Sequence, residues 1–213
     1  MKLRRGDTLL FIGDSITDAG RARPVGEGPG LGGGYPSQVA ALLGATYPEL
    51  GIKVLNTGIS GNTVRHLADR WQTDVIGLKP QWLSIMIGTN DVWRQFDGRG
   101  TPVLPEEYTT TLRELITRTK PLVRGISVLT PFYIQPDRNE PMRKRMDEYG
   151  KLAASVARAT GCAFADTQAA YDKAMAVTDP LGLAGDRVHP SPTGHMVLSR
   201  AFLGTIGYDW GRP

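Results

Sequence analysis

Residues 8–18 read Thr-Leu-Leu-Phe-Ile-Gly-Asp-Ser-Ile-Thr-Asp. The run of large apolar side chains from Leu9 to Ile12 predicts a buried strand, and Gly13 permits a tight turn directly after it. Ser15 would then stand at a strand-to-helix turn, where its hydroxyl is presented above the sheet and the helix N-terminus supplies backbone N–H groups. Because Asp and Ser are also common helix caps, the stretch alone is also typical of a turn without chemistry.

The rest of the chain alternates short apolar runs with longer amphipathic segments. We expect strands at Thr8–Ile12, Lys53–Thr57, Trp82–Ile87, Gly125–Leu129 and Ala163–Asp166. We expect helices at about Tyr35–Tyr47, Thr63–Ile76, Pro105–Lys120, Pro141–Thr160 and Pro192–Ile206. Regular alternation implies βαβ crossovers, so the predicted fold class is α/β, a three-layer α/β/α sandwich around a central five-stranded parallel sheet.

The composition is that of an ordinary globular protein. The chain has 213 residues, enough for one domain with a core and too few for two, so we expect a single domain over 1–213. The net charge is +4, from 25 Lys and Arg against 21 Asp and Glu that are interspersed, and we therefore expect no nucleic-acid partner. We interpret Arg143-Lys144-Arg145 as a solvated helix face. No apolar run approaches the roughly 18 residues of a membrane span, so we expect a cytoplasmic protein without a membrane partner.

A second chemical motif is Asp186-Arg187-Val188-His189-Pro190, close to the C-terminus. A catalytic base must reach the nucleophile and must itself be oriented by a third group. An aspartate three residues before a histidine can fold back in a turn and accept a hydrogen bond from its Nδ1–H. Pro190 disfavours helical backbone at His189 and keeps that residue on a loop. In isolation, a surface loop with a local ion pair is the simpler explanation of the motif.

Two further motifs follow the second and third expected strands. They are Gly58-Ile59-Ser60-Gly61-Asn62-Thr63 and Gly88-Thr89-Asn90-Asp91. Acyl transfer builds negative charge on a carbonyl oxygen, and fixed hydrogen-bond donors around that oxygen lower the barrier. A glycine N–H and an asparagine amide are suitable donors, although Gly and Asn are also common in ordinary turns. All four motifs lie at one edge of one predicted sheet, where ligands bind in open parallel sheets.

This set of motifs, in this order, resembles the SGNH hydrolase superfamily, also called GDSL esterases, over essentially the whole chain. The resemblance implies a flavodoxin-like fold and a serine hydrolase. It makes Ser15 the nucleophile, His189 the base and Asp186 the residue that orients the base. The oxyanion hole would consist of the N–H groups of Ser15 and Gly61 and the side chain of Asn90. The first motif reads Gly-Asp-Ser-Ile, where many members have leucine in the fourth position.

A narrower resemblance links the chain to bacterial intracellular acetylxylan esterases of this superfamily, which deacetylate xylo-oligosaccharides. It implies a carbohydrate ester as substrate and a homo-oligomer. One departure is Gly185, where these relatives carry tryptophan directly before the catalytic aspartate. The stretches that carry the resemblance are Gly13–Arg23, Gly58–Arg65, Ser84–Gln95, Thr130–Ile134, Met142–Gly150, Asp166–Tyr171 and Asp186–Pro190.

Three residues near the motifs are candidates for substrate binding: Asp14, Trp93 and Arg94. An aromatic face suits a sugar ring, and an arginine suits a hydroxyl or an acidic group, although packing of the loop would explain both residues as well. Asp14 and Asp18 as a glycosidase pair is disfavoured, because two carboxylates four residues apart in a capped turn more often tune helix electrostatics.

We expect neither cofactor nor metal. Gly28-x-Gly30-x-x-Gly33 matches a dinucleotide fingerprint formally, but it does not close the first strand and Pro29 interrupts it. The three histidines, His66, His189 and His195, show no metal-ligand spacing.

The sequence therefore predicts a serine esterase for short acyl groups, with acetylated xylo-oligosaccharides as the favoured substrate. One alternative is an esterase of the same kind for a lysophospholipid, thioester or aryl ester, because the triad would be identical and only the pocket would differ. The other is a carbohydrate-binding protein with a vestigial site.

Overall fold

Six strands form one sheet in the order β2-β3-β1-β4-β5-β6 in the computed structural model, which describes residues 1–212. Every neighbouring pair is parallel except β2 and β3. The parallel strands are β1 (Thr8–Gly13), β3 (Lys53–Asn56), β4 (Trp82–Met86), β5 (Gly125–Leu129) and β6 (Ala163–Ala165). They correspond to the five predicted strands, so the predicted α/β class with a parallel core is confirmed.

The prediction of five strands is wrong by one, because β2 (Gly26–Glu27) adds a short antiparallel strand at the edge beside β3. Two residues cannot display the alternating hydrophobicity by which a strand is recognised. They also lie in a segment dense in glycine, which gives no strand signal.

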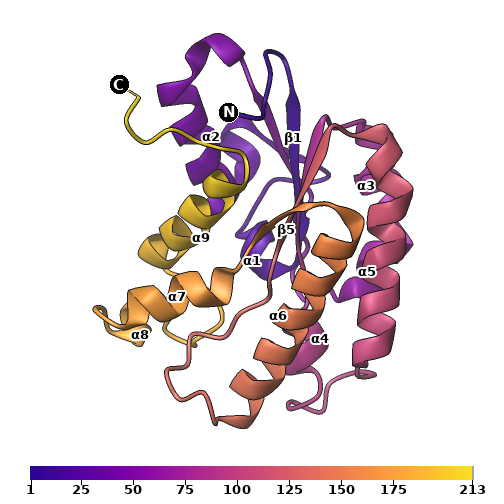
Figure 1. Cartoon of the computed structure of the whole chain (residues 1–213), viewed down its shortest axis with the longest axis vertical. Coiled ribbons are helices and arrows are strands. Elements are labelled where there is room, and N and C mark those ends of the chain that lie inside the picture. The colour runs from indigo at the N-terminus through magenta and orange to yellow at the C-terminus, as the bar shows by residue number, and fades with distance from the viewer. Residues whose placement is uncertain (213) are drawn as a thin grey trace.

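Helices cover both faces of the sheet (Figure 1). Helices α2, α7 and α9 lie on one side, and α3, α5 and α6 lie on the other. Their bounds are α2 Tyr35–Thr46, α3 Val64–Asp74, α5 Pro105–Thr119, α6 Pro141–Thr160, α7 Thr167–Met175 and α9 Pro192–Thr205. Shorter α-helices are α1 (Ser15–Asp18), α4 (Thr89–Trp93) and α8 (Pro180–Leu183). Single 3₁₀ turns are η1 Gly28–Leu31, η2 Pro48–Leu50, η3 Ile76–Leu78 and η4 Lys120–Leu122.

Successive residues of β1 supply two separate hydrophobic cores. Leu9 and Phe11 pack with α2 and α9, whereas Leu10 and Ile12 pack with α3, α5 and α6. All four side chains are completely buried. Because neighbouring side chains point to opposite faces, a strand buried on both faces has to be apolar throughout. This double burial fixes the position of β1 and hence of the loop that follows it.

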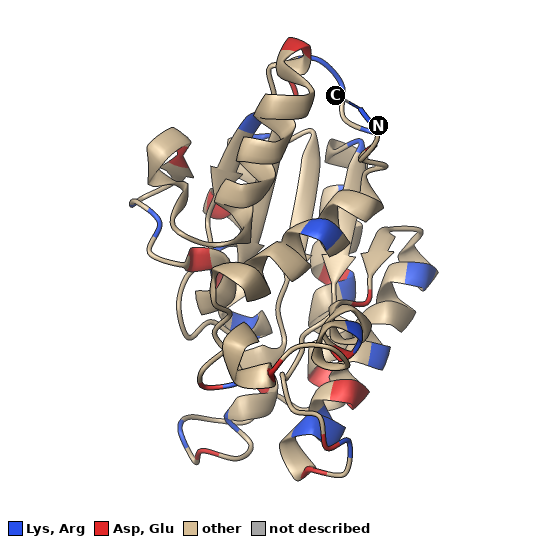
Figure 2. Ribbon diagram, turned by 90° about the vertical axis from the view of Figure 1, so that its left-hand side faces the viewer, with Lys and Arg blue, Asp and Glu red and all other residues tan. Residues whose placement is uncertain are grey.

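Figure 2 shows basic and acidic residues interspersed over the helices and loops in that view. Within residues 1–212, no helix is both long and apolar enough to cross a membrane.

The start of α9 approaches the backbone of α8 closely. A Cβ atom on Gly194 would overlap the carbonyl oxygen of Leu183, which accepts a hydrogen bond from the Ser191 N–H at 2.8 Å. Gly194 also accepts a bond from the Tyr171 hydroxyl at 2.9 Å. The absence of a side chain at Gly194 therefore allows α9 to begin directly after the loop that carries His189.

We predict that Gly194→Ala lowers the free energy of unfolding by about 1–3 kcal/mol, because the methyl group can only displace backbone. For a chain of this size, that corresponds to a fall in melting temperature of about 2–4 °C for each kcal/mol. The matched control is Gly204→Ala on the same helix, where an added Cβ meets nothing within 4 Å. There we expect no loss, or a gain of up to about 1 kcal/mol. Equal melting temperatures for the two variants would contradict the close approach.

Candidate active site

Ser15 is the first residue of α1 and follows β1 after a single connecting residue. The turn is tight because Gly13 has no side chain, and a Cβ there would overlap both the Met86 carbonyl and the Thr17 hydroxyl. Asp14 caps α1, since its carboxylate accepts a hydrogen bond from the Ile16 N–H at 3.0 Å. The N–H of Ser15 is one of the groups at a helix start that have no partner within the helix.

The structure brings Ser15, His189 and Asp186 into one chain of hydrogen bonds. Ser15 Oγ lies 2.9 Å from His189 Nε2, and His189 Nδ1 lies 2.6 Å from Asp186 Oδ2. The other carboxylate oxygen of Asp186 accepts hydrogen bonds from the backbone N–H groups of Val188 and His189, at 3.0 and 2.8 Å. This geometry allows His189 to take a proton from Ser15 while Asp186 fixes its tautomer and orientation.

Asp186 remains ionised in this arrangement. Partial burial disfavours the carboxylate, but hydrogen bonds from the His189 ring and from two backbone amides outweigh it and hold the pKa of Asp186 below its ordinary value. The Asp186 and His189 side chains are half-exposed, at 50% and 47%. The site is therefore open to solvent on the side of the loop before α9.

Gly61 and Asn90 lie on the loops that follow β3 and β4. Gly61 has φ +80°, a left-handed conformation that suits glycine. The Asn90 side-chain amide donates one hydrogen bond to the Asn62 carbonyl at 3.0 Å. An amide nitrogen carries two hydrogens, so this contact orients the group and leaves the second N–H for a ligand.

Two buried carboxylic acids lie beneath these loops. Burial raises the pKa of Asp14 to about 7, although the bond from the Ile16 N–H opposes the shift. Burial likewise raises the pKa of Asp91 to about 7, and the nearby Asp14 adds to the rise. Asp91 accepts a hydrogen bond from the Val64 N–H at 3.0 Å through one oxygen, and its other oxygen has no hydrogen-bond partner.

The three candidates for substrate binding are placed differently. Trp93 is half-buried beside the base, with its ring centroid 6.1 Å from that of His189. Arg94 pairs with Asp97 at 2.7 Å, and a Cβ on Gly61 would lie 3.7 Å from its Nη2. Asp14 is 1% exposed and occupied as a helix cap. A buried cap presents no surface to a substrate, so Asp14 is not part of the substrate site proposed below.

The remaining positions singled out in the sequence lie around the site. His195 is buried at the start of α9, where its Nδ1 accepts a hydrogen bond from the Tyr35 N–H at 3.2 Å, and burial lowers its pKa to about 4. His66 is exposed and takes part in the cap of α3 with Thr63. At Gly185, an added Cβ would meet nothing within 4 Å, so this chain has open space directly before Asp186.

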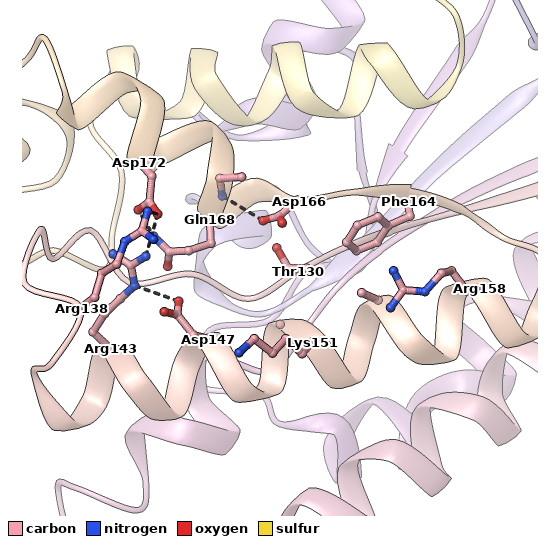
Figure 3. A pocket seen from close by; sticks show the side chains of 13 residues that line it. Thr130, Arg138, Arg143, Asp147, Lys151, Arg158, Phe164, Asp166, Gln168 and Asp172 are labelled. Atoms are coloured by element: carbon pink, nitrogen blue, oxygen red, sulfur yellow. Dashed lines mark hydrogen bonds and ion pairs between the residues drawn. The ribbon is translucent and has the colours of Figure 1, made fainter.

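A separate cleft of about 450 Å³ lies between α6 and α7, and Ser15, Gly61, Asn90, Asp186 and His189 are not among the residues that line it (Figure 3). Figure 3 shows Arg143 turned toward Asp147 and Asp172, to which it donates hydrogen bonds of 2.8 Å each. The prediction of a solvated cluster at 143–145 is wrong for Arg143, which is 2% exposed. Its three donor nitrogens satisfy two carboxylates and the Gln135 carbonyl, and this offsets the cost of burial.

The fold and the Ser-His-Asp arrangement define a hydrolase with a serine at the first strand-to-helix turn. The chain belongs to the GDSL-like lipase/acylhydrolase family, whose model matches residues 11–197. It is 56% identical to the acetylxylan esterase of Geobacillus stearothermophilus over 217 aligned residues, which cover 100% of this chain and 99% of that protein.

The structural neighbours agree with this assignment. The crystal structure of that acetylxylan esterase, Axe2, has a TM-score of 0.96 at 56% identity and covers 99% of this chain and 98% of its own. A catalytic mutant of Axe2 with serine replaced by alanine has a TM-score of 0.97 at 55% identity, with full coverage of both chains. Further catalytic mutants of Axe2 replace a histidine or an aspartate with alanine. LAE5, an α/β hydrolase from the metagenome of Lake Arreo, has a TM-score of 0.94 at 47% identity over 97% of this chain and 98% of its own.

The buried acids make stability depend on pH in a defined direction. Between about pH 4 and pH 7 the folded state holds a proton on Asp91 that the unfolded chain releases, so stability falls as the pH rises through this window. We predict that Asp91→Asn makes this fall shallower. Relative to wild type, the variant should gain at least about 1 kcal/mol between pH 4.5 and pH 8 in urea denaturation.

The matched control is Asp69→Asn, which changes an exposed carboxylate on α3. It should leave the slope of stability against pH as in wild type. A slope that is the same for wild type, Asp91→Asn and Asp69→Asn would show that Asp91 is not the group that titrates.

Proposed function

We propose that this protein is a serine esterase that removes acetyl groups from xylo-oligosaccharides. The observation that carries the proposal is the continuous chain of hydrogen bonds from Ser15 through His189 to Asp186. The amide of Asn90, oriented by the Asn62 carbonyl, adds a candidate donor for the oxyanion hole. In this proposal Ser15 is the nucleophile, His189 is the base and Asp186 orients the base. Asn90 is one donor of the oxyanion hole.

The reaction proceeds in two halves. In the first, His189 Nε2 takes the proton of Ser15 Oγ as that oxygen bonds to the ester carbonyl carbon. The electron pair of the C=O bond moves onto the oxygen, which the N–H groups of Ser15 and Gly61 and the amide of Asn90 hold. The intermediate collapses, the bond to the sugar oxygen breaks, and that oxygen takes the proton from His189.

In the second half, water gives its proton to His189 and attacks the acetyl-serine carbonyl carbon. Collapse of this intermediate breaks the bond to Ser15 Oγ, returns the proton from His189 to that oxygen and releases acetic acid, which loses its proton to water and becomes acetate. Asp186 stays ionised throughout and stabilises the imidazolium formed in each half.

The substrate class rests on two kinds of support. This chain is similar along its full length to an acetylxylan esterase. In addition, Trp93 presents an aromatic ring beside the base, and Arg94 lies over Gly61. These side chains could contact a sugar bound on the exposed side of the triad. An esterase for another short-chain ester is the second candidate, because the triad would serve it equally.

We further propose that residues 1–213 act as one domain and that the protein is a cytoplasmic homo-oligomer. The support for both the compartment and the assembly is the resemblance to intracellular acetylxylan esterases. Light scattering coupled to gel filtration measures the assembly directly, and a mass equal to one chain, 23.1 kDa, would contradict it.

The first activity test is acetate release from acetylated xylo-oligosaccharides by wild type and by Ser15→Ala. We expect release by the wild type, and a loss of at least about 10⁴-fold in kcat for Ser15→Ala, because the acyl-enzyme no longer forms. Ser15→Ala turning over at the wild-type rate would overturn the mechanism. If the wild type cleaves a small aryl acetate but no oligosaccharide, the mechanism stands and the substrate class is wrong.

A second test separates sugar binding from chemistry. We predict that Arg94→Ala raises KM for an acetylated xylo-oligosaccharide by about 5- to 50-fold, the loss of a charge-assisted hydrogen bond. Its kcat/KM for a small aryl acetate should change less than about threefold, because that substrate has no sugar hydroxyl for Arg94 to bind. Arg99→Ala, an exposed arginine of the same loop, is the matched control. An equal loss on both substrates would remove Arg94 from the sugar site.

A further inference from the structure

The loop from Gly58 to Thr63 carries Gly61, one proposed donor of the oxyanion hole, and its position is fixed by side chains from other elements. Asp18 accepts hydrogen bonds from the N–H and the hydroxyl of Ser60, at 3.0 and 3.2 Å. Arg21 donates to the Gly58 carbonyl at 2.6 Å. Gly61 is followed directly by Asn62, whose side chain accepts a hydrogen bond from an arginine on α3.

That arginine is Arg70, whose side chain is 13% exposed. Its Nε donates to the Asn62 side-chain oxygen at 2.8 Å, and its Nη1 donates to the Thr57 carbonyl at 2.6 Å. Its Nη2 donates to the Gly13 carbonyl at 3.1 Å. One rigid, planar guanidinium therefore joins the end of β1, the end of β3 and the oxyanion-hole loop.

Both sides of Asn62 are held. Its side-chain oxygen accepts from Arg70, and its carbonyl accepts from the Asn90 amide at 3.0 Å. Gly61 directly precedes Asn62, and Ser15 lies two residues after Gly13. Arg70 thus links the backbone on which two of the proposed donors stand and, through Asn62, the side chain that supplies the third.

We propose that Arg70 is a positioning residue for the oxyanion hole, which sets the Gly61 N–H and the Asn90 amide relative to Ser15. This inference rests on the proposed function of the site. Donors stabilise the transition state only when they are already placed where charge develops, and displacements of about 1 Å far from the chemistry can cost about 10²-fold. Arg70 touches no reacting atom and acts only through these loops.

Arg70 also forms an ion pair with Asp74, four residues later on α3, at 2.7 Å. This ion pair offers a simpler explanation of why an arginine stands at position 70, namely that it only stabilises α3. The two explanations differ in what Asp74 should do, because Asp74 has no contact with the oxyanion-hole loop through its carboxylate. Asp74→Asn removes the ion pair and keeps an oxygen that can accept from Arg70.

The experiment compares Arg70→Met, Arg70→Lys, Asn62→Ala and Asp74→Asn, with Asn90→Ala as reference for direct loss of a donor. Melting temperature is measured for each, together with kcat and KM on a small aryl acetate. Arg70→Met should lower kcat by about 10- to 100-fold with KM within about threefold, because the oxyanion exists only in the transition state. Asn62→Ala should lower kcat in the same way but less, and Arg70→Lys should recover part of the loss.

Asp74→Asn should retain kcat within about twofold, since it leaves the three loop contacts in place. In the double variant Arg70→Met with Asn62→Ala, the loss should be no larger than that of Arg70→Met alone, because both act on one contact. If Arg70→Met does not fold, the kcat values of Asn62→Ala and Arg70→Lys test the positioning role instead.

Two results would overturn the inference. One is a wild-type kcat in a folded Arg70→Met or, if Arg70→Met does not fold, a wild-type kcat in Asn62→Ala. The other is a loss of kcat in Asp74→Asn as large as in Arg70→Met. Either leaves the proposed function standing as long as Asn90→Ala lowers kcat. If Asn90→Ala keeps the wild-type kcat, the proposed oxyanion hole fails, and the role of Arg70 fails with it.

Discussion

Strand β1 lies between β3 and β4, and its register with both sets the level at which three loops leave the sheet. Phe11 pairs with Asn56 of β3, and Gly13 pairs with Met86 of β4. A slip of one residue would exchange the side chains that face the two cores, and both cores are completely buried around β1. Packing on two faces therefore fixes the register of β1, and it also fixes the position of the turn that carries Ser15.

The loops at this edge bury backbone polar groups that no strand or helix satisfies. Such groups need partners, and here the partners are mostly charged side chains. Arg21 and Arg70 donate to the Gly58 and Thr57 carbonyls after β3. Asp18 accepts from the Ser60 N–H next to Gly61, and Asp91 accepts from the Val64 N–H directly after this loop. Hydrogen bonds to charged groups are shorter and stronger than neutral ones. A loop held in this way needs little reorganisation when negative charge develops beside it.

The cost of this arrangement appears in the buried acids. Asp14 and Asp91 lie close to each other, and burial raises the pKa of each to about 7. Only some of their oxygens find donors, since one oxygen of Asp91 has none. Ionisation of either acid in the folded protein is therefore unfavourable.

The sequence predicts the strands and helices that have a periodic apolar pattern. It does not predict features that arise only when distant segments pack together. The five parallel strands and the long helices follow from their apolar patterns, and Asp186 with His189 follows from a spacing that closes a local turn. Helix α7 was not predicted, since nine residues with alanines give a weak pattern. The contacts of Arg70 with the loops have no signal in the sequence. With Asp74 four residues later, Arg70 is typical of a solvated ion pair, and only the packing of α3 against the sheet edge turns the guanidinium toward Asn62.

The half-exposed Asp186 shows how His189, the proposed base, can be oriented without deep burial. The turn places Arg187 at φ +65°, an unfavourable conformation for a residue with a side chain. Three hydrogen bonds to the Asp186 carboxylate and one from the Ile134 N–H to the Arg187 carbonyl at 2.9 Å offset that cost. Because the turn spans only a few residues, the loop-closure entropy of bringing Asp186 to His189 is small.

What the turn cannot supply is the contact of His189 with Ser15, which joins residues 174 apart in the chain. The distance between Ser15 Oγ and His189 Nε2 depends on where α9 begins. The start of α9 is held by Gly194 against α8 and by His195 against the Tyr35 N–H at 3.2 Å. The turn with Asp186 thus orients the His189 ring, and the packing of α9 places that ring relative to Ser15. A change in the packing of α9 should therefore alter the Ser15–His189 distance while leaving the Asp186–His189 pair intact.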